Sequence, residues 1–174
     1  HSADIVFSSN VLEHVAHIDE FLAETRRVLA PGGIAIHVLP STACRLWSLP
    51  AHYLWLLKRA FQRGVHTAQS DDSAMRQPDV PRTPANLNEW LATLFPTRHG
   101  ERGNVLTEAW YFSRHWWKRT FQRNGFVVAR MEPNHLFYTM SNVMTDRIEI
   151  STRIKLSGYL GSSCTIYLLR SNER

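Results

Sequence analysis

Glu13 and His14 place a carboxylate and an imidazole side by side in the segment NVLEH. Neutral histidine can accept a proton near neutral pH, so His14, with Glu13 beside it, is a candidate general base. Asn10, Glu13 and His14 are also spaced so that one helical turn would bring them to one side, where they could hold a divalent cation. The structural alternative is a carboxylate favoured by a helix start and a histidine packed under a binding loop. We favour this alternative and predict no metal ligands.

Two more candidate catalytic residues, His99 and Tyr111, lie far along the chain. Either side chain could orient an acceptor oxygen or exchange a proton with it. His99 begins the run HGERGN over residues 99–104, which is typical of a loop, and a plain surface loop is the favoured alternative for it. His37 lies inside an apolar run and is expected to be a buried, hydrogen-bonded histidine.

The residues around Glu13 and His14 are expected to fold as a strand, a helix and a strand. Residues 5–7 are apolar throughout, as in a buried parallel strand. Apolar residues recur at helical spacing over 18–29, and Pro-Gly-Gly at 31–33 ends that helix and allows a sharp reversal. Residues 34–39 read as the next strand. A unit of this length has parallel strands and a right-handed crossover.

The stretch 41–112 is too long for an ordinary connection and is predicted to be an insertion or lid. It contains an expected helix over 48–64, with Ser48 as its cap, and a shorter helix that begins near Thr83. The first of these helices combines Trp55 and leucines with basic residues (Lys58, Arg59, Arg63). Such a helix could lie on an anionic membrane surface, although a lid with a solvated basic rim is the favoured alternative.

The C-terminal third is expected to contain a helix capped by Ser113 and strands over 126–131 and 164–169. Residues 148–156 carry an alternating pattern typical of a strand, but a helix remains the other possibility.

The composition indicates a single cytoplasmic domain. The chain has 174 residues, of which 44% are hydrophobic, and this length and content can bury a core. No apolar run reaches the ~18 residues of a membrane span. The two cysteines lack metal-binding spacing and are expected to be reduced. The net charge of +5 comes without a nucleic-acid-binding motif, so nucleic acid is an unlikely partner.

Four segments of the chain resemble class I S-adenosylmethionine-dependent methyltransferases, in the order of that family. They are FSSNVLEHV (7–15), LAPGG (29–33), HWWKRTFQRNGFVVAR (115–130) and CTIYLLR (164–170). The resemblance implies an α/β, partial Rossmann-like sheet that begins at the family's strand 4. Its strand order would be 4-5-7-6, with strand 7 antiparallel. It also favours the helix for residues 148–156.

The resemblance further implies where a cofactor would lie. Ligands of open α/β sheets bind beyond the carboxyl ends of parallel strands. Carried over, Ser8, Ser9, Asn10 and Val11 are the expected contacts for S-adenosylmethionine, with Leu12 packing nearby. The alternative is that Ser9 and Asn10 only satisfy the turn and cap the next helix.

The glycine-rich turn and the acidic ribose-binding residue of this family have no counterpart before the first strand. We therefore expect a single incomplete domain over 1–174 that binds the cofactor weakly or not at all and is inactive by itself. The parent protein would be a methyltransferase acting on a small-molecule, glycan or lipid-linked acceptor. The alternative is a non-catalytic module that pairs, with itself or a partner, through the exposed edge of its first strand.

Overall fold

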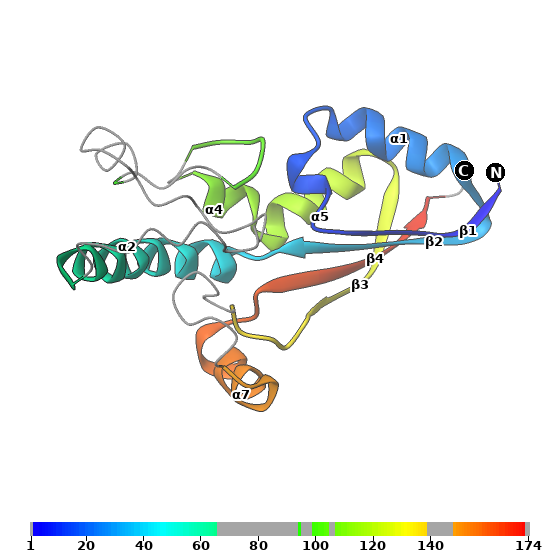
Figure 1. Cartoon of the computed structure of the whole chain (residues 1–174). Helices are drawn as coiled ribbons and strands as arrows, with labels where there is room; N and C mark the ends of the chain where they lie inside the picture. The colour runs from blue at the N-terminus through cyan, green and yellow to red at the C-terminus, as the bar shows by residue number, and fades with distance from the viewer. Residues whose placement is uncertain (1, 66–93, 95–98, 105–106, 139–147, 173–174) are drawn as a thin grey trace, which may run out of the picture.

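The computed structural model describes residues 2–65, 94, 99–104, 107–138 and 148–172. Its elements form one mixed sheet with helices around it (Figure 1). In chain order they are β1 Ala3–Ser9, the 3-10 helix η1 Leu12–His14, α1 Ile18–Val28, β2 Leu29–Pro40, α2 Thr42–Val65, α4 Glu108–Tyr111, α5 Arg114–Arg123, β3 Phe126–Pro133, α7 Ile150–Leu160 and β4 Cys164–Ser171.

The order of the strands in the sheet is β1-β2-β4-β3. β1 and β2 run parallel, and β4 runs antiparallel to both of its neighbours. The expected order 4-5-7-6 with an antiparallel strand 7 is therefore confirmed, as is the α/β class. Within the described part of the chain, β1 is an edge strand.

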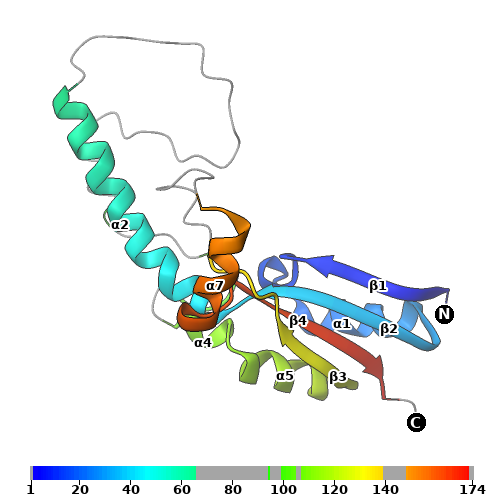
Figure 2. The ribbon, with the colours of Figure 1, turned by 90° about the horizontal axis from the view of Figure 1, so that it is seen from below.

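Helices α1 and α5 cover the same face of the sheet (Figures 1 and 2). Each helix turns a short, mostly apolar stripe inward, because its buried residues recur at helical spacing. The stripe of α1 is Ile18, Leu22 and Thr25, and that of α5 is Trp117, Thr120 and Phe121. These helices pack with Leu12, Tyr167 and Leu169 into one core.

The Pro-Gly-Gly corner differs from its prediction. The strand was expected over 34–39, but β2 starts at Leu29 and takes in residues 31–33. The pairing shifts between Ala3↔Leu29 and Ile5↔Ile34, so the extra residues bulge out of the ladder. Gly32 has φ of 77°, the left-handed region that glycine enters without penalty. The reversal is thus absorbed within an irregular strand.

Helix α2 also begins earlier than expected, at Thr42, so Ser48 is not its cap. The hydroxyl of Ser41 accepts a hydrogen bond from the Cys44 N–H at 3.1 Å, which satisfies a free donor of the first turn. Pro50 lies inside the helix. The expected helix near Thr83 lies outside the described residues.

The C-terminal predictions are confirmed. Ser113 caps α5, since its hydroxyl accepts from the Trp116 N–H at 3.2 Å. Residues 150–160 form helix α7 and not a strand, which settles the ambiguous segment. β3 and β4 each extend two residues beyond the expected ends. None of the helices in the described segments is long and apolar enough to pass through a lipid bilayer.

Candidate active site at the carboxyl end of β1

The chain turns sharply where β1 ends, and this turn leaves three residues exposed. Asn10 has φ of 51°, a left-handed conformation that asparagine tolerates better than most residues. Its N–H donates to the carbonyl of Val38 on β2 at 2.9 Å, which fixes the turn against the neighbouring strand. Ser9, Asn10 and Val11 are exposed there. This end of a parallel strand pair is where open α/β sheets bind ligands.

The two residues that flank the turn face the core instead. Leu12 is 0% exposed and belongs to the core cluster, so it packs under the turn. The hydroxyl of Ser8 lies 2.8 Å from Nδ1 of His37. Ser8 was expected to contact the cofactor and Leu12 to pack nearby; Ser8 is partly exposed and Leu12 is buried beneath the turn.

His37 is the buried, hydrogen-bonded histidine that its position in β2 predicts. Its side chain is inaccessible to solvent, and its ring stacks on Phe121 at a centroid distance of 5.8 Å. Burial lowers the pKa of His37 to about 4. The imidazole is therefore neutral near pH 7 and serves the core.

Glu13 brings a carboxylate into the interior directly beneath the turn. Its side chain is 0% exposed, and Oε1 lies 3.9 Å from Nε2 of the half-exposed His14. Neither carboxylate oxygen receives a hydrogen bond from any other residue in the described segments. Burial raises the pKa of Glu13, and this effect exceeds the opposing effects of its own backbone and of His14. A carboxyl in this setting keeps its proton to a higher pH than an exposed one.

His99, in the loop 99–104, lies beside Glu13 and His14. The rings of His14 and His99 lie 5.4 Å apart between centroids, tilted by 57°. One possible ligand atom from each of Glu13, His14 and His99 lies within 4.8 Å of the other two. Burial and the nearby His14 lower the pKa of His99, so its ring favours the neutral form. Three of the four predicted catalytic residues therefore form one cluster.

The loop 99–104 is held over η1 by backbone contacts. The N–H of Glu101 donates to the carbonyl of Glu13 at 2.9 Å. Arg102 donates to the carbonyls of Leu12 and Val15 and lies over the ring of Trp116. The loop is therefore largely exposed but anchored to η1, beside Glu13 and His14.

Tyr111, the fourth predicted residue, reaches the site only through a small cavity. The cavity has a volume of about 10 Å³, which is close to the room that one water requires. Its lining includes Glu13, Tyr111 and Trp117. The ring of Tyr111 packs against Trp116 at 5.4 Å, so the side chain is half-buried and constrained.

Arg45 and Glu108 support the loop, and neither was predicted to have a role. Their side chains are 5% and 0% exposed and form an ion pair with Nε and Oε2 2.9 Å apart. The other oxygen of Glu108 accepts from the N–H groups of His99, at 2.6 Å, and Gly100. No local pattern links these residues in the sequence. The only available signal was a lone acid in a largely aromatic stretch.

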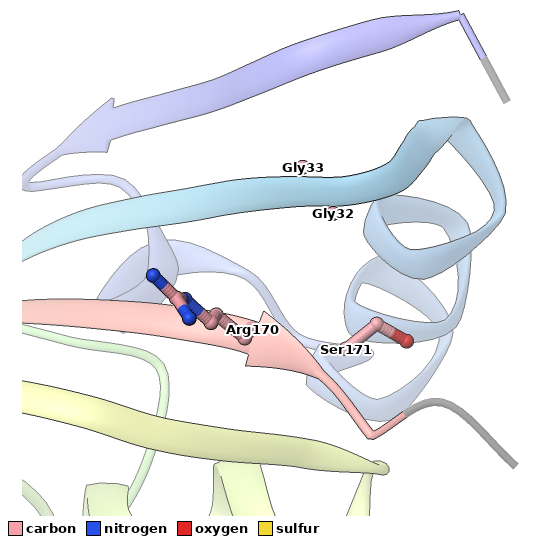
Figure 3. Close-up of a pocket in the computed structure, with 4 residues that line it drawn as sticks. All are labelled: Gly32, Gly33, Arg170 and Ser171. Carbon is pink, nitrogen blue, oxygen red and sulfur yellow. The ribbon is translucent and has the colours of Figure 1, made fainter.

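A larger hollow lies at the other end of the sheet (Figure 3). It measures about 220 Å³ and is lined by Gly32, Gly33, Arg170 and Ser171. Ile34 of β2 pairs with Arg170 near the end of β4, so this hollow adjoins the start of the parallel pair. It contains none of the predicted site residues, and its position is the opposite of the usual ligand end.

The fold and the cluster define an α/β protein with a polar site beyond a parallel strand pair. Residues 1–37 match the family model of the methyltransferase domain, and this segment contains β1, η1, α1 and most of β2. The predicted resemblance to methyltransferases is confirmed for this unit.

Similar solved structures are those of PKMT2 from Rickettsia typhi. The first is 15% identical with a TM-score of 0.39, and it covers 98% of this chain and 36% of that chain. The second, in complex with AdoHcy, is 13% identical with a TM-score of 0.38 and covers 99% and 36%. The chain thus spans little more than a third of the length of these proteins. No curated protein matches it.

Proposed function

We propose that this chain is the C-terminal portion of an S-adenosylmethionine-dependent methyltransferase that acts on a small-molecule, glycan or lipid-linked acceptor. One observation carries the proposal. Strand β1 and most of its parallel partner β2 lie in the segment that matches the methyltransferase domain, and β1 leads into three exposed residues, Ser9, Asn10 and Val11.

These three residues fit one side of S-adenosylmethionine. Ser9 and Asn10 offer polar side chains to its polar groups, and Val11, 41% exposed, offers apolar surface. When bound, the cofactor supplies an electrophilic methyl group on its sulfonium. These three residues would not bind the ribose, which in this family is bound by the glycine-rich turn and an acidic residue. We therefore expect the chain alone to bind the cofactor weakly.

The chain's own contribution is to orient the acceptor and to accept its proton. Orientation supplies much of the acceleration of such a displacement. The carboxyl of Glu13 has a raised pKa, and the rings of His14 and His99 stand beside it. These groups would take up a proton from an acceptor hydroxyl or amine. The contacts of loop 99–104 with η1 would hold His99 in place for this role.

Amide NMR of the chain with added S-adenosylhomocysteine tests the cofactor side of the proposal. We expect signals of Ser9, Asn10 and Val11 to shift progressively and to saturate only at high ligand concentration. Signals of Gly32 and Gly33, in the opposite hollow, should stay in place. Adenosine alone and an unrelated sulfonium salt control for non-specific effects.

Two valine variants give a matched comparison. Val11→Lys places a charge in the expected contact surface, whereas Val127→Lys changes a similarly exposed residue, 49% accessible, on β3. We expect only the first to abolish the shifts. Shifts centred elsewhere, no shifts at saturating ligand, or equal loss in both variants would contradict the proposal.

The alternative is an interaction module that pairs through β1. The supporting observation is that Ile5 and Phe7 are 59% and 64% exposed on this edge strand. Exposed apolar edge strands pair readily with other chains. A module of this kind would pair without binding S-adenosylhomocysteine, so the titration with that ligand separates the two candidates.

A further inference from the structure

The cluster of Glu13, His14 and His99 contains the ligand types of a transition-metal site. One carboxylate oxygen and two imidazole nitrogens lie within 4.8 Å of one another. They come from two segments, η1 and the loop 99–104, so the arrangement is a product of tertiary folding. One carboxylate and two imidazoles also form the protein ligand set of many catalytic zinc sites.

The buried carboxylate is a second and independent indication of a ligand. Glu13 is 0% exposed on its side chain, and apart from its own backbone neither oxygen has a hydrogen-bond donor in the described part of the chain. The nearest positively charged partner would be His14, at 3.9 Å. An ionised carboxylate without donors is costly to bury, and bound cations commonly compensate such groups.

The surrounding structure holds both segments in position. The backbone of Glu101 donates to the carbonyl of Glu13, and Glu108 accepts from the backbone of His99. Gly100 permits this close approach, because a Cβ there would lie 3.0 Å from the carbonyl oxygen of Glu13. A metal site needs supporting contacts of this kind to fix its ligands.

We propose that Glu13, His14 and His99 bind one divalent transition-metal ion, of the zinc or cobalt type. Metal–ligand bonds of 2.0–2.2 Å require ligand atoms about 3.4 Å apart in a tetrahedron, so the cluster must close slightly around the ion. The half-exposed His14 can supply that movement by rotation. Three protein ligands leave at least one position open for water or an acceptor oxygen. With the ion bound, the three side chains would act as ligands and not as bases, and the ion would instead make the proton of the bound oxygen easier to lose.

Metal titration of the chelator-treated chain tests this proposal without any cofactor or acceptor. We expect one Co²⁺ per chain, with visible absorption bands of nitrogen and oxygen coordination, and displacement by Zn²⁺. Glu13→Gln and His99→Asn should each weaken binding by at least ~10-fold, since even residues that only orient a ligand contribute 10–100-fold. The result does not depend on methyl transfer and is interpretable if that function is wrong.

A second acid–base pair serves as the matched control. His17 and Glu20 are also 3.9 Å apart but are exposed at the surface of α1. His17→Asn and Glu20→Gln should leave Co²⁺ binding unchanged. Circular dichroism establishes that each variant is folded. The visible Co²⁺ spectrum of the unsubstituted chain tests the proposal even if a variant does not fold.

Three outcomes would overturn the proposal. The first is a chain that binds neither Co²⁺ nor Zn²⁺. The second is equal loss of binding in the His17 and Glu20 variants, which would indicate surface binding. The third is full affinity for Co²⁺ in Glu13→Gln. The burial of the Glu13 carboxyl would then be explained by its protonation or by a water in the adjoining cavity.

Discussion

Arg45 of α2 and Glu108 of α4 form a nearly fully buried ion pair, with Nε and Oε2 2.9 Å apart. Glu108 also accepts from the backbone of His99 and Gly100. A single carboxylate therefore joins two helices and the loop that carries a candidate catalytic histidine.

Glu108→Ala should destabilise the chain strongly. It leaves Arg45 as a buried charge without its ion-pair partner and removes the acceptor of two backbone N–H groups. Loss of one partner of a buried pair lowers the free energy of unfolding by about 3–5 kcal/mol. Urea unfolding measures the change. Glu24→Ala, in the exposed pair with Arg27, is the control and should change it by less than about 1 kcal/mol. Equal effects of the two variants would contradict the structural role.

His37 should make the chain less stable in acid. Its pKa is about 4 when folded against an ordinary value of 6.5, so the unfolded chain binds more protons between these values. The free energy of unfolding should therefore fall as the pH drops from 6.5 to 4, by roughly 3 kcal/mol from this group. The measurement is urea unfolding across this range for the unsubstituted chain and for His37→Asn. The difference between them isolates the histidine, and parallel curves would refute its titration.

Arg102→Ala should loosen the loop without unfolding the core. The guanidinium donates to carbonyls of Leu12 and Val15, so its removal frees one side of the loop. We expect the Glu101 amide, bonded to Glu13, to exchange with solvent about 10-fold faster, which corresponds to ~1.4 kcal/mol. Hydrogen exchange by NMR measures this rate. Arg123→Ala, which breaks the exposed pair with Asp19, should leave that amide unaffected.

Phe7→Lys should reduce self-association of the chain. Phe7 is 64% exposed on the edge strand β1, and an edge lysine discourages pairing between strands. Sedimentation velocity over a range of concentrations should show dimers for the unsubstituted chain and about 10-fold weaker association for the variant. Tyr159→Lys, at an 89% exposed residue of α7, is the control. A chain that stays monomeric at every concentration would rule out pairing through this edge.

Local sequence patterns predicted a helix or strand well where the residues that define it lie within that element. The strand, helix and strand over residues 3–40 and the Ser113 cap could be expected from the residues themselves. The order of the strands was implied only by the resemblance to class I methyltransferases. The predicted start of α2 was wrong. Ser48 and Pro50 together resemble the first residues of a helix, but the residue that caps α2 is Ser41. Such competition between two caps is decided by tertiary packing.

The sequence predicted which residues could belong to the site, but not that they lie close together. Glu13, His14 and His99 were each candidates on chemical grounds, and only the fold shows that they meet. The contacts that bring His99 there belong to Glu108, Arg45 and Arg102. Their partners lie in other segments and are mostly backbone groups, which have no sequence signature.

The two contacts of Glu108 link helix α2 to the cluster of Glu13, His14 and His99. Glu108 grips Arg45 through one oxygen and the backbone of His99 through the other. The position of the His99 backbone is therefore set by the same carboxylate that neutralises a charge on α2. A substitution at Arg45, outside the cluster, should be felt at the imidazole through Glu108.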